Sequence, residues 1–173
     1  MEFDGVIRVL GVDTALRCTG YGVIDSDGQQ FVAVDCGVIR NTAKAPWSVC
    51  LRNLNGGMRE LVDEYAPDMA ALEGSFYSRN AKTAMILGMA RGSVLAALAT
   101  LETPVYEYAP RRVKQAVCGY GNASKVQVAA LIAQMLNIDT EGIPDDATDA
   151  LALAVCHAQT AFTSKGLYLP DPL

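Results

Sequence analysis

The sequence predicts an α/β fold in which helices cover both faces of a mixed five-stranded sheet. Three strand-like segments follow one another near the N-terminus with tight turns between them, which is the pattern of an antiparallel meander. After them, helical periodicity alternates with short apolar runs, which is typical of parallel strand–helix–strand units. The chain has 173 residues, enough for one domain with a sizeable core. We therefore expect a single domain over residues 1–173.

The N-terminal half contains the meander, one helix and one further strand. Alternating apolar and β-branched residues predict strands over residues 6–13, 20–24 and 31–39, with a turn at 25–28. Apolar residues at helical spacing predict a helix over residues 47–65, ending before Pro67. The apolar run 69–73 predicts a fourth, buried strand.

The C-terminal half continues with three helices and one strand. The helices are expected over residues 81–101, 124–136 and 145–162, and the strand over residues 105–108, ended by Pro110. Ser124 and Gln127 form a capping-box pattern at one helix start. Residues 165–173 contain two prolines and are expected to form an extended tail.

The composition is that of a globular protein, with 51% hydrophobic residues. The N-terminus shows no signal-peptide pattern, and the longest apolar stretches are far shorter than a membrane span. A cytoplasmic location is therefore expected. The five cysteines include no C-x-x-C pair and are joined by a single histidine, which argues against zinc and against a disulfide framework. Reduced thiols are the expected state.

The charge balance argues against nucleic-acid binding. The net charge is −5 and the pI is about 4.8, whereas phosphate binding depends on Lys and Arg. Net charge nevertheless describes the whole surface and not one face, and a metal-binding acidic cluster adds negative charge that its cations offset. Only a specific signal can outweigh this argument.

Four carboxylates supply a signal of that kind, because each begins or ends a predicted element in an apolar neighbourhood. Asp13 ends the first strand, Glu73 ends the fourth, and Asp146 and Asp149 open the last helix on one face. Chance or helix capping explains any one of them, with Asp145 or Asp146 as the cap, but explains all four much less readily. A carboxylate at the end of a buried run is costly unless it is paired.

These carboxylates would meet if the first and fourth strands were neighbours and the last helix packed beside them. Oxygen ligands of this kind suit Mg²⁺ or Mn²⁺. Two such ions can activate a water molecule and stabilise the leaving oxygen of a phosphodiester. The pattern therefore favours metal-dependent hydrolysis of a nucleic acid.

Ordered motifs over residues 7–160 closely resemble the RuvC family of Holliday-junction resolvases, which has a ribonuclease-H-like fold. Any one motif would be a weak signal, but the ordered set is a strong one. The main motifs are Gly11-Val-Asp13, Thr19-Gly-Tyr-Gly-Val-Ile24, Glu73-Gly-Ser-Phe76, Leu87-Gly-Met-Ala-Arg-Gly92, Tyr108-Ala-Pro-Arg-Arg-Val-Lys-Gln115 and Asp146-Ala-Thr-Asp-Ala-Leu-Ala152.

The resemblance implies a homodimer that resolves four-way DNA junctions by paired symmetric nicks, leaving 5′-phosphate and 3′-hydroxyl ends. It also makes a branch-migration helicase complex a candidate partner. By position, the catalytic acids and metal ligands are Asp13, Glu73, Asp146 and Asp149, with two Mg²⁺ or Mn²⁺ ions per site. Asp145 competes with Asp146, because it also shares a face with Asp149, but the family pattern favours Asp146.

One departure concerns the turn after the first catalytic acid. The family usually has Pro-Gly-Ser there, whereas this chain has Thr14-Ala15-Leu16. Proline and glycine fix the shape of a turn, so the shape of this one is open.

Basic and aromatic residues extend the predicted site to DNA. Arg111, Arg112, Lys114 and Lys125 form the densest basic cluster, for which a solvated face is the alternative. By resemblance, Lys114 and Lys125 contact phosphate, and Phe76 stacks on a base at the crossover. Arg79, in the same loop as Phe76, is a further candidate for DNA binding.

Two other features have competing interpretations. Gly88, Gly92 and Ala96 recur every four residues on one predicted helix, where they allow close packing either within the domain or between two subunits. His157 lies two turns beyond Asp149, too far for direct metal ligation, so a core or surface position is expected.

Two rival functions stay open at this stage. An actin-like or sugar-kinase-like ATPase also places an Asp before a Thr on its first strand, as Asp13 and Thr14 do here. Such enzymes normally need two domains and glycine-rich nucleotide loops, for which this chain is short. A catalytically inactive junction-binding protein is the other rival, should the altered turn spoil the site.

Overall fold

The computed structural model describes residues 5–74, 80–163 and 169–173. Its strands are β1 (Ile7–Asp13), β2 (Cys18–Ser26), β3 (Phe31–Arg40), β4 (Met69–Glu73) and β5 (Val105–Tyr108). Its helices are α1 (Trp47–Tyr65), α2 (Ala81–Thr100), α3 (Pro110–Cys118), α4 (Lys125–Leu136) and α5 (Asp145–Phe162).

The strands form one mixed sheet in the order β3-β2-β1-β4-β5. The first three strands are antiparallel, and β4 and β5 run parallel to β1. The predicted five-stranded sheet and the predicted neighbourhood of the first and fourth strands are both confirmed. The strand β2 is longer than predicted, because it pairs along its whole length with β3 on one side and over residues 20–26 with β1 on the other.

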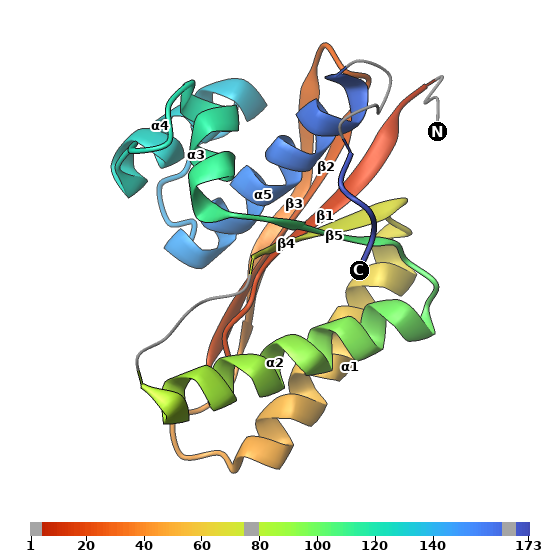
Figure 1. The fold of residues 1–173 in the computed structure, drawn as a ribbon, viewed down its shortest axis with the longest axis vertical. Coiled ribbons are helices and arrows are strands. Elements are labelled where there is room, and N and C mark those ends of the chain that lie inside the picture. Colours follow the sequence, from red (N-terminus) through yellow and green to blue (C-terminus); the bar gives the residue numbers. More distant parts are fainter. Residues whose placement is uncertain (1–4, 75–79, 164–168) are drawn as a thin grey trace.

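Two helical layers cover the sheet, with α1 and α2 on one face and α3, α4 and α5 on the other (Figure 1). Side chains alternate between the two faces along each strand, so the sheet separates the core into two parts. Val9 and Ala71 pack on the α5 side, whereas Leu10 and Leu72 pack on the side of α1 and α2. Two hydrogen bonds involving Ser93 tie α2 to α1.

The helix α3 was not predicted from the sequence, in which Pro110 indicated only the end of a strand. Pro110 is instead the first residue of this helix, where the missing N–H costs nothing and the fixed φ suits a helix. Gly119 ends the helix in the left-handed region, with φ 81°. This helix matters for the site, because it carries three of the four residues of the basic cluster.

The helix α2 is long and apolar enough to cross a membrane by length and composition alone, with a mean hydropathy of 1.4. It packs in the core through Ala90, Val94, Ala97 and Leu98. Its apolar composition is therefore partly that of a core helix, but small and apolar residues of α2 are also exposed on its outer surface.

Residues 169–173 form no helix or strand, in agreement with the predicted extended tail. The backbone N–H of Leu173 donates to the carbonyl oxygen of Val105 at 2.9 Å, which holds this segment against the edge strand β5. Residues 165–168 of the predicted tail lie outside the described residues.

Candidate active site

Asp13 and Glu73 lie side by side because they end two adjacent parallel strands. Val12 pairs with Leu72 in the β1–β4 register, so the next residue of each strand comes at the same edge of the sheet. The alternation that places Val9 and Ala71 on the α5 side places these two carboxylates on that side as well.

Glycines on the strands bring α5 to the same edge. A Cβ atom at Gly20 would collide with the backbone carbonyl oxygen of Asp146, and one at Gly11 would collide with that of Ala150. A Cβ at Gly22 would lie 2.8 Å from the backbone nitrogen of Leu151. Only glycine allows the helix to approach so closely, and Gly20 is the register partner of Asp13.

The carboxylates of Asp13, Glu73 and Asp149 therefore line one open cleft of about 450 Å³, together with Lys114 and Lys125. The three acids come from β1, β4 and α5, as the sequence predicted. The two lysines come from α3 and α4.

The close approach of the acids is evident in the pKa of Asp13. Burial, and then the charges of Glu73, Asp149 and Asp146, raise this pKa to about 7, against the opposing effect of Lys125. The pKa of Glu73 is also raised, first by burial and then by Asp149. The cleft concentrates more negative charge than its lysines neutralise.

Lys125 is placed by a helix start. Ser124 caps α4 through the predicted capping box with Gln127, and Lys125 is the first residue of the helix. Its ammonium pairs with the Asp149 carboxylate at 2.6 Å, and this hydrogen bond raises the lysine pKa. A positive group thus lies against one of the predicted metal ligands.

Asp146 and Asp145 have different surroundings. Asp146 is half-buried, and its charge raises the pKa of Asp13. Burial, and then a hydrogen bond with Asp146, raise the pKa of the Cys18 thiol. Asp145 is exposed, and its charge acts on Lys125. These surroundings support Asp146 as the member of the acidic cluster.

The described acidic residues at the cleft carry the donor atoms that a divalent metal ion prefers, but they are not drawn together around one point. Among the described residues, no three acidic, histidine or cysteine side chains converge closely enough to bind one ion as they stand. The donors at the cleft are nevertheless carboxylate oxygens, which hard divalent cations prefer. The hydroxyl of Thr14, which also lines the cleft, is buried and lacks a partner among the described residues. Acids whose pKa is raised, as for Asp13 and Glu73, beside a buried hydroxyl with no partner in the described part of the chain, fit a hydrated cation.

The turn after Asp13 is well held although it lacks the family's proline and glycine. The Thr19 hydroxyl donates to the carbonyl oxygen of Ala15 and accepts from its N–H. The side chain of Asn41 donates to the carbonyl oxygen of Leu16 at 2.9 Å, and Leu16 itself is buried in the core. Side-chain bonds and burial replace the local stiffness of the missing residues.

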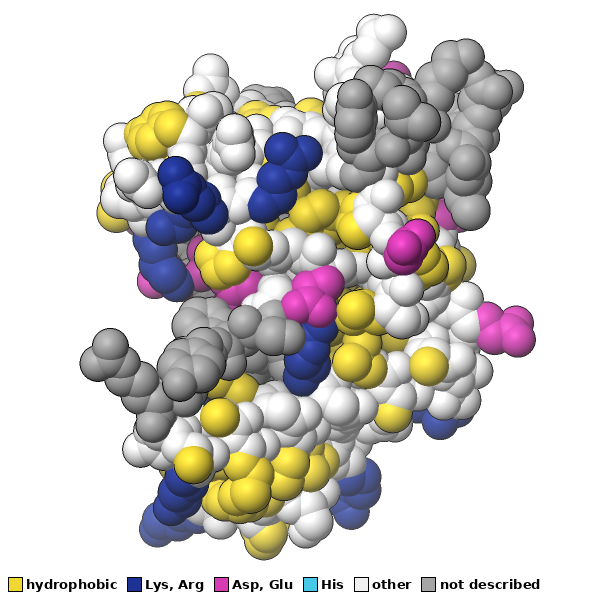
Figure 2. All heavy atoms as spheres, in the orientation of Figure 1, with side chains coloured by type: hydrophobic (Ala, Val, Ile, Leu, Met, Phe, Trp, Pro, Cys, Tyr) yellow, Lys and Arg dark blue, Asp and Glu magenta, His cyan; other side chains and the backbone are white. Residues whose placement is uncertain are grey.

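The remaining basic residues divide between faces of α3. Lys114 lines the cleft, whereas Arg111 and Arg112 are exposed and do not line it. Figure 2 shows Lys and Arg side chains in the upper and the lower parts of this face, with acidic side chains in the middle between them. Phe76 and Arg79 lie outside the described residues.

Two features near the site have no predicted role from the sequence. One is the run of glycines under α5, which the spacing of Gly20 and Gly22 on one face of a strand could have indicated. The other is Arg91, which shares the apolar helix α2 with only one other charged residue, Lys82. Its guanidinium reaches Glu107 and the backbone of Glu73.

A mixed sheet with carboxylates gathered where β1, β4 and α5 meet defines a nuclease with a ribonuclease-H-like fold. Residues 9–157 match the family described as crossover junction endodeoxyribonuclease RuvC. The chain belongs to this RuvC family.

Relatives over nearly the whole chain agree with this assignment. The RuvC of Chloroflexus aggregans is 44% identical over 91% of this chain and 96% of that protein. The RuvC of Protochlamydia amoebophila is 41% identical over 94% of this chain and 96% of that protein.

Among solved structures, Thermus thermophilus RuvC in complex with a Holliday junction substrate has a TM-score of 0.88 at 29% identity. It covers 96% of this chain and 99% of that one. The yeast mitochondrial Holliday junction resolvase Ydc2 covers 87% of this chain and 78% of its own, with a TM-score of 0.65 at 12% identity, and shares the fold. The RuvC relatives favour the nuclease over the ATPase and the inactive binding protein.

Proposed function

We propose that this endonuclease resolves four-way DNA junctions by paired symmetric nicks during recombination and repair in the cytoplasm. Water attacks a phosphodiester and leaves a 5′-phosphate and a 3′-hydroxyl. The observation that carries the proposal is the cleft in which Asp13, Glu73 and Asp149 meet Lys114 and Lys125. Carboxylates and lysine ammonium groups in one cleft suit a site that must hold both metal cations and a phosphate.

The metal ligands in this proposal are Asp13, Glu73, Asp146 and Asp149. Two Mg²⁺ or Mn²⁺ ions would activate the attacking water and stabilise the leaving oxygen. Burial, and then repulsion from the neighbouring acids, raise the pKa of Asp13. Both support a cation at this place, because a cation would stabilise the buried carboxylates and relieve their repulsion. Asp13 and Glu73 end rigid strands, and such positions hold ligands in fixed directions.

Lysine and arginine side chains of the protein bind the DNA backbone. Lys114 and Lys125 lie at the cleft and contact the phosphates near the cut. Arg111 and Arg112, exposed elsewhere on α3, contact phosphates farther along the strand. Phe76 and Arg79 complete the interface, with Phe76 stacking on an unpaired base at the crossover, an interaction worth roughly 1–3 kcal/mol.

A homodimer supplies the second nick, because a junction with two-fold symmetry calls for an enzyme with two-fold symmetry. The helix α2 supports this part of the proposal, since it exposes Met85, Gly88, Gly92 and Ala96. Hydrophobic side chains gather over α2 in the lower half of the molecule (Figure 2). A branch-migration helicase complex is the proposed further partner.

The test is a nicking assay with Mg²⁺ on a synthetic four-way junction, with Asp13→Asn and Glu73→Gln beside the wild type. Each variant removes a metal-binding charge and keeps the side-chain shape, so cleavage should fall at least about 1000-fold while junction binding survives. Asp63→Asn, an exposed acid on α1, is the matched control and should cut normally.

Near-normal cleavage by Asp13→Asn would show that the proposed site is wrong. Binding by the wild type without any nicking would favour the inactive junction-binding protein. The first outcome is cleavage by the Asp13→Asn variant and the second is the absence of cleavage by the wild type, so one experiment separates them.

A further inference from the structure

The guanidinium of Arg91 reaches from α2 to the end of β4. Its Nη1 donates to the backbone carbonyl oxygen of Glu73 at 2.8 Å. Its Nη2 pairs with Oε2 of Glu107 on β5 at 2.6 Å. Both charged side chains are largely enclosed, with 20% of Arg91 and 26% of Glu107 exposed. The proposed function gives neither residue a role.

The carbonyl group of Glu73, to which Arg91 donates, lies at the end of β4, where the pairing with β1 has already stopped. The β1–β4 register ends at the pair of Val12 and Leu72, so Glu73 lies beyond the last pair of that ladder. On the β5 side, Gly74 donates to the carbonyl oxygen of Tyr108 at 2.7 Å. Glu73 is the last residue of β4, and Arg91 supplies a donor to its carbonyl oxygen.

The direction of approach shows what Arg91 acts on. The side chain of Glu73 faces the α5 side, whereas Glu107 lies on the opposite face, which Val105 shares. Arg91 therefore holds the backbone of Glu73 from behind the sheet and leaves its carboxylate free in the cleft. A charge-assisted hydrogen bond of this kind is stronger than one between neutral groups.

We propose that Arg91 is a positioning residue for Glu73, and that Glu107 fixes Arg91 in turn. The guanidinium fixes the backbone at the end of β4, so that the carboxylate keeps its direction toward Asp13. An arginine suits this task because its fork binds two acceptors at once, which a lysine does only loosely. The inference rests on the proposed function in one respect, namely that Glu73 is a metal-binding catalytic acid.

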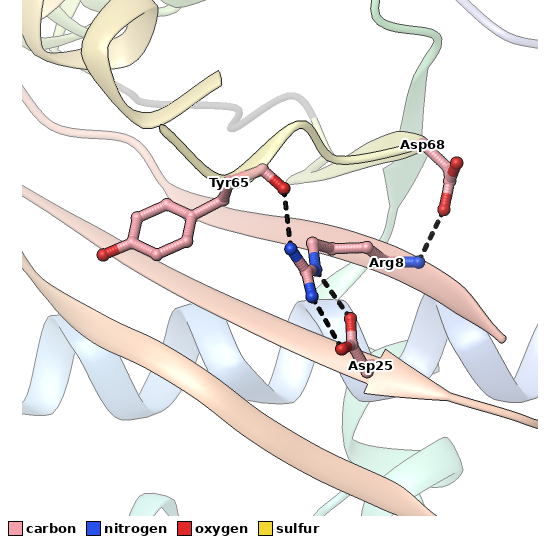
Figure 3. Close-up of polar contacts among 4 residues, drawn as sticks. All are labelled: Arg8, Asp25, Tyr65 and Asp68. Carbon is pink, nitrogen blue, oxygen red and sulfur yellow. Dashed lines mark hydrogen bonds and ion pairs between the residues drawn. The ribbon is translucent and has the colours of Figure 1, made fainter. Parts of the chain in front are cut away.

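The chain offers a matched control with the same construction. Arg8 makes a two-pronged ion pair with Asp25, at 2.7 and 2.8 Å, and donates through Nη1 to the carbonyl oxygen of Tyr65 at 3.0 Å (Figure 3). This pair also joins an arginine to a carboxylate and to a backbone carbonyl, but neither residue is among the described ones that line the acidic cleft. Loss of stability alone should therefore be similar in Arg8→Met and Arg91→Met.

The experiment compares Arg91→Met, Arg91→Lys, Glu107→Gln and Arg8→Met in four measurements: kcat on a four-way junction, junction Kd, melting temperature, and Mn²⁺ affinity of the free protein by calorimetry. Loss of a group that orients a metal ligand typically costs 10- to 100-fold. Arg91→Met should lose about that much in kcat and bind Mn²⁺ about 10-fold more weakly, with junction Kd unchanged. Arg91→Lys should recover part of both losses, Glu107→Gln should show a smaller loss, and Arg8→Met should keep wild-type kcat and Mn²⁺ affinity.

Three outcomes would overturn the inference: normal kcat and Mn²⁺ affinity in Arg91→Met, an equal loss in Arg8→Met at equal melting temperature, or a loss confined to junction Kd. Should Arg91→Met fail to fold, the Lys and Gln variants decide on the same readouts. Glu73→Gln, measured beside them, separates this inference from the proposed function. If Glu73→Gln is inactive and Arg91→Met is normal, only the positioning role fails, whereas an active Glu73→Gln removes the proposed site itself.

Discussion

His157 is a fully buried side chain that the sequence left undecided between core and surface. The structure places it in the core, where its Nδ1 lies 2.8 Å from the Tyr108 hydroxyl and its ring stacks near Tyr106. Its Nε2 lies 3.1 Å from the sulfur of Met69. Burial lowers its pKa from 6.5 to about 4.

This pKa predicts a pH-dependent loss of stability. Between about pH 4 and 6.5 the unfolded chain binds a proton at this histidine that the folded chain does not. The free energy of unfolding therefore falls as the pH falls through this window, by roughly 3 kcal/mol from this group. Urea unfolding of the wild type and of His157→Asn between pH 4 and 7.5 should show the variant less stable at pH 7.5 but less sensitive to acid.

Tyr108→Phe is the control, because it removes the hydrogen bond and keeps the buried histidine. It should be destabilised with the wild-type pH dependence. Asp13, whose raised pKa gives stability the opposite slope between about pH 4 and 7, is present in all three proteins and cancels in the comparison. Equal slopes in His157→Asn and the wild type would contradict the assignment.

At the scale of elements, the close contact between α5 and the sheet decides the shape of the cleft. The glycines of β1 and β2 face the buried alanines Ala147 and Ala150 of α5. Small residues on both surfaces let the helix backbone lie almost on the strands. Asp146 and Asp149 owe their position to this contact.

We predict that Gly20→Ala destabilises the protein by about 2 kcal/mol and also lowers cleavage, because the added Cβ collides with the backbone at Asp146. Gly56→Ala is the matched control, since Gly56 lies in α1 with open space around its Cα. That change should stabilise the protein by roughly 0.5–1 kcal/mol and leave cleavage unchanged. Thermal unfolding and the nicking assay check both variants, and a Gly20→Ala protein as stable as Gly56→Ala would refute the close contact.

At the scale of the whole molecule, the net charge of −5 conceals an uneven distribution. Lys114 and Lys125 lie at the cleft. Their replacement by Ala should weaken junction binding and reduce the slope of log K against log salt by up to about 1 per contact in each subunit. The double variant Arg52→Ala with Arg59→Ala, exposed on α1, should keep the wild-type slope. A normal slope in the lysine double variant would place the DNA on another face.

Assembly is the second property of the whole molecule that can be tested. Gly92 on α2 has open space around its Cα within one subunit, so Gly92→Leu should fold normally. In the proposed dimer the leucine would separate the two helices, so sedimentation should show a folded monomer with little paired nicking. Gly56→Leu, equally unhindered but on α1, should remain dimeric. A dimeric Gly92→Leu protein would exclude this part of α2 from the interface.

The sequence by itself predicted all five strands and four of the five helices of the described chain, and it proposed the acidic residues of the site. The helices over residues 47–65 and 145–162 and the strands over 69–73 and 105–108 lie where the periodicity predicted them. These patterns depend on neighbours within one element, so they can be read locally. The family motifs added the choice of Asp146 over Asp145, which the half-buried position of Asp146 supports.

Only the tertiary structure decided how these elements meet. The pairing of Lys125 with Asp149, the hold of Arg91 on the carbonyl of Glu73 and the burial of His157 join segments 24, 18 and 49 residues apart. Such contacts depend on the packing of whole layers, which no local period encodes. Even the start of α3 at Pro110 needed the structure, because a proline that ends a strand and one that begins a helix look the same in the sequence.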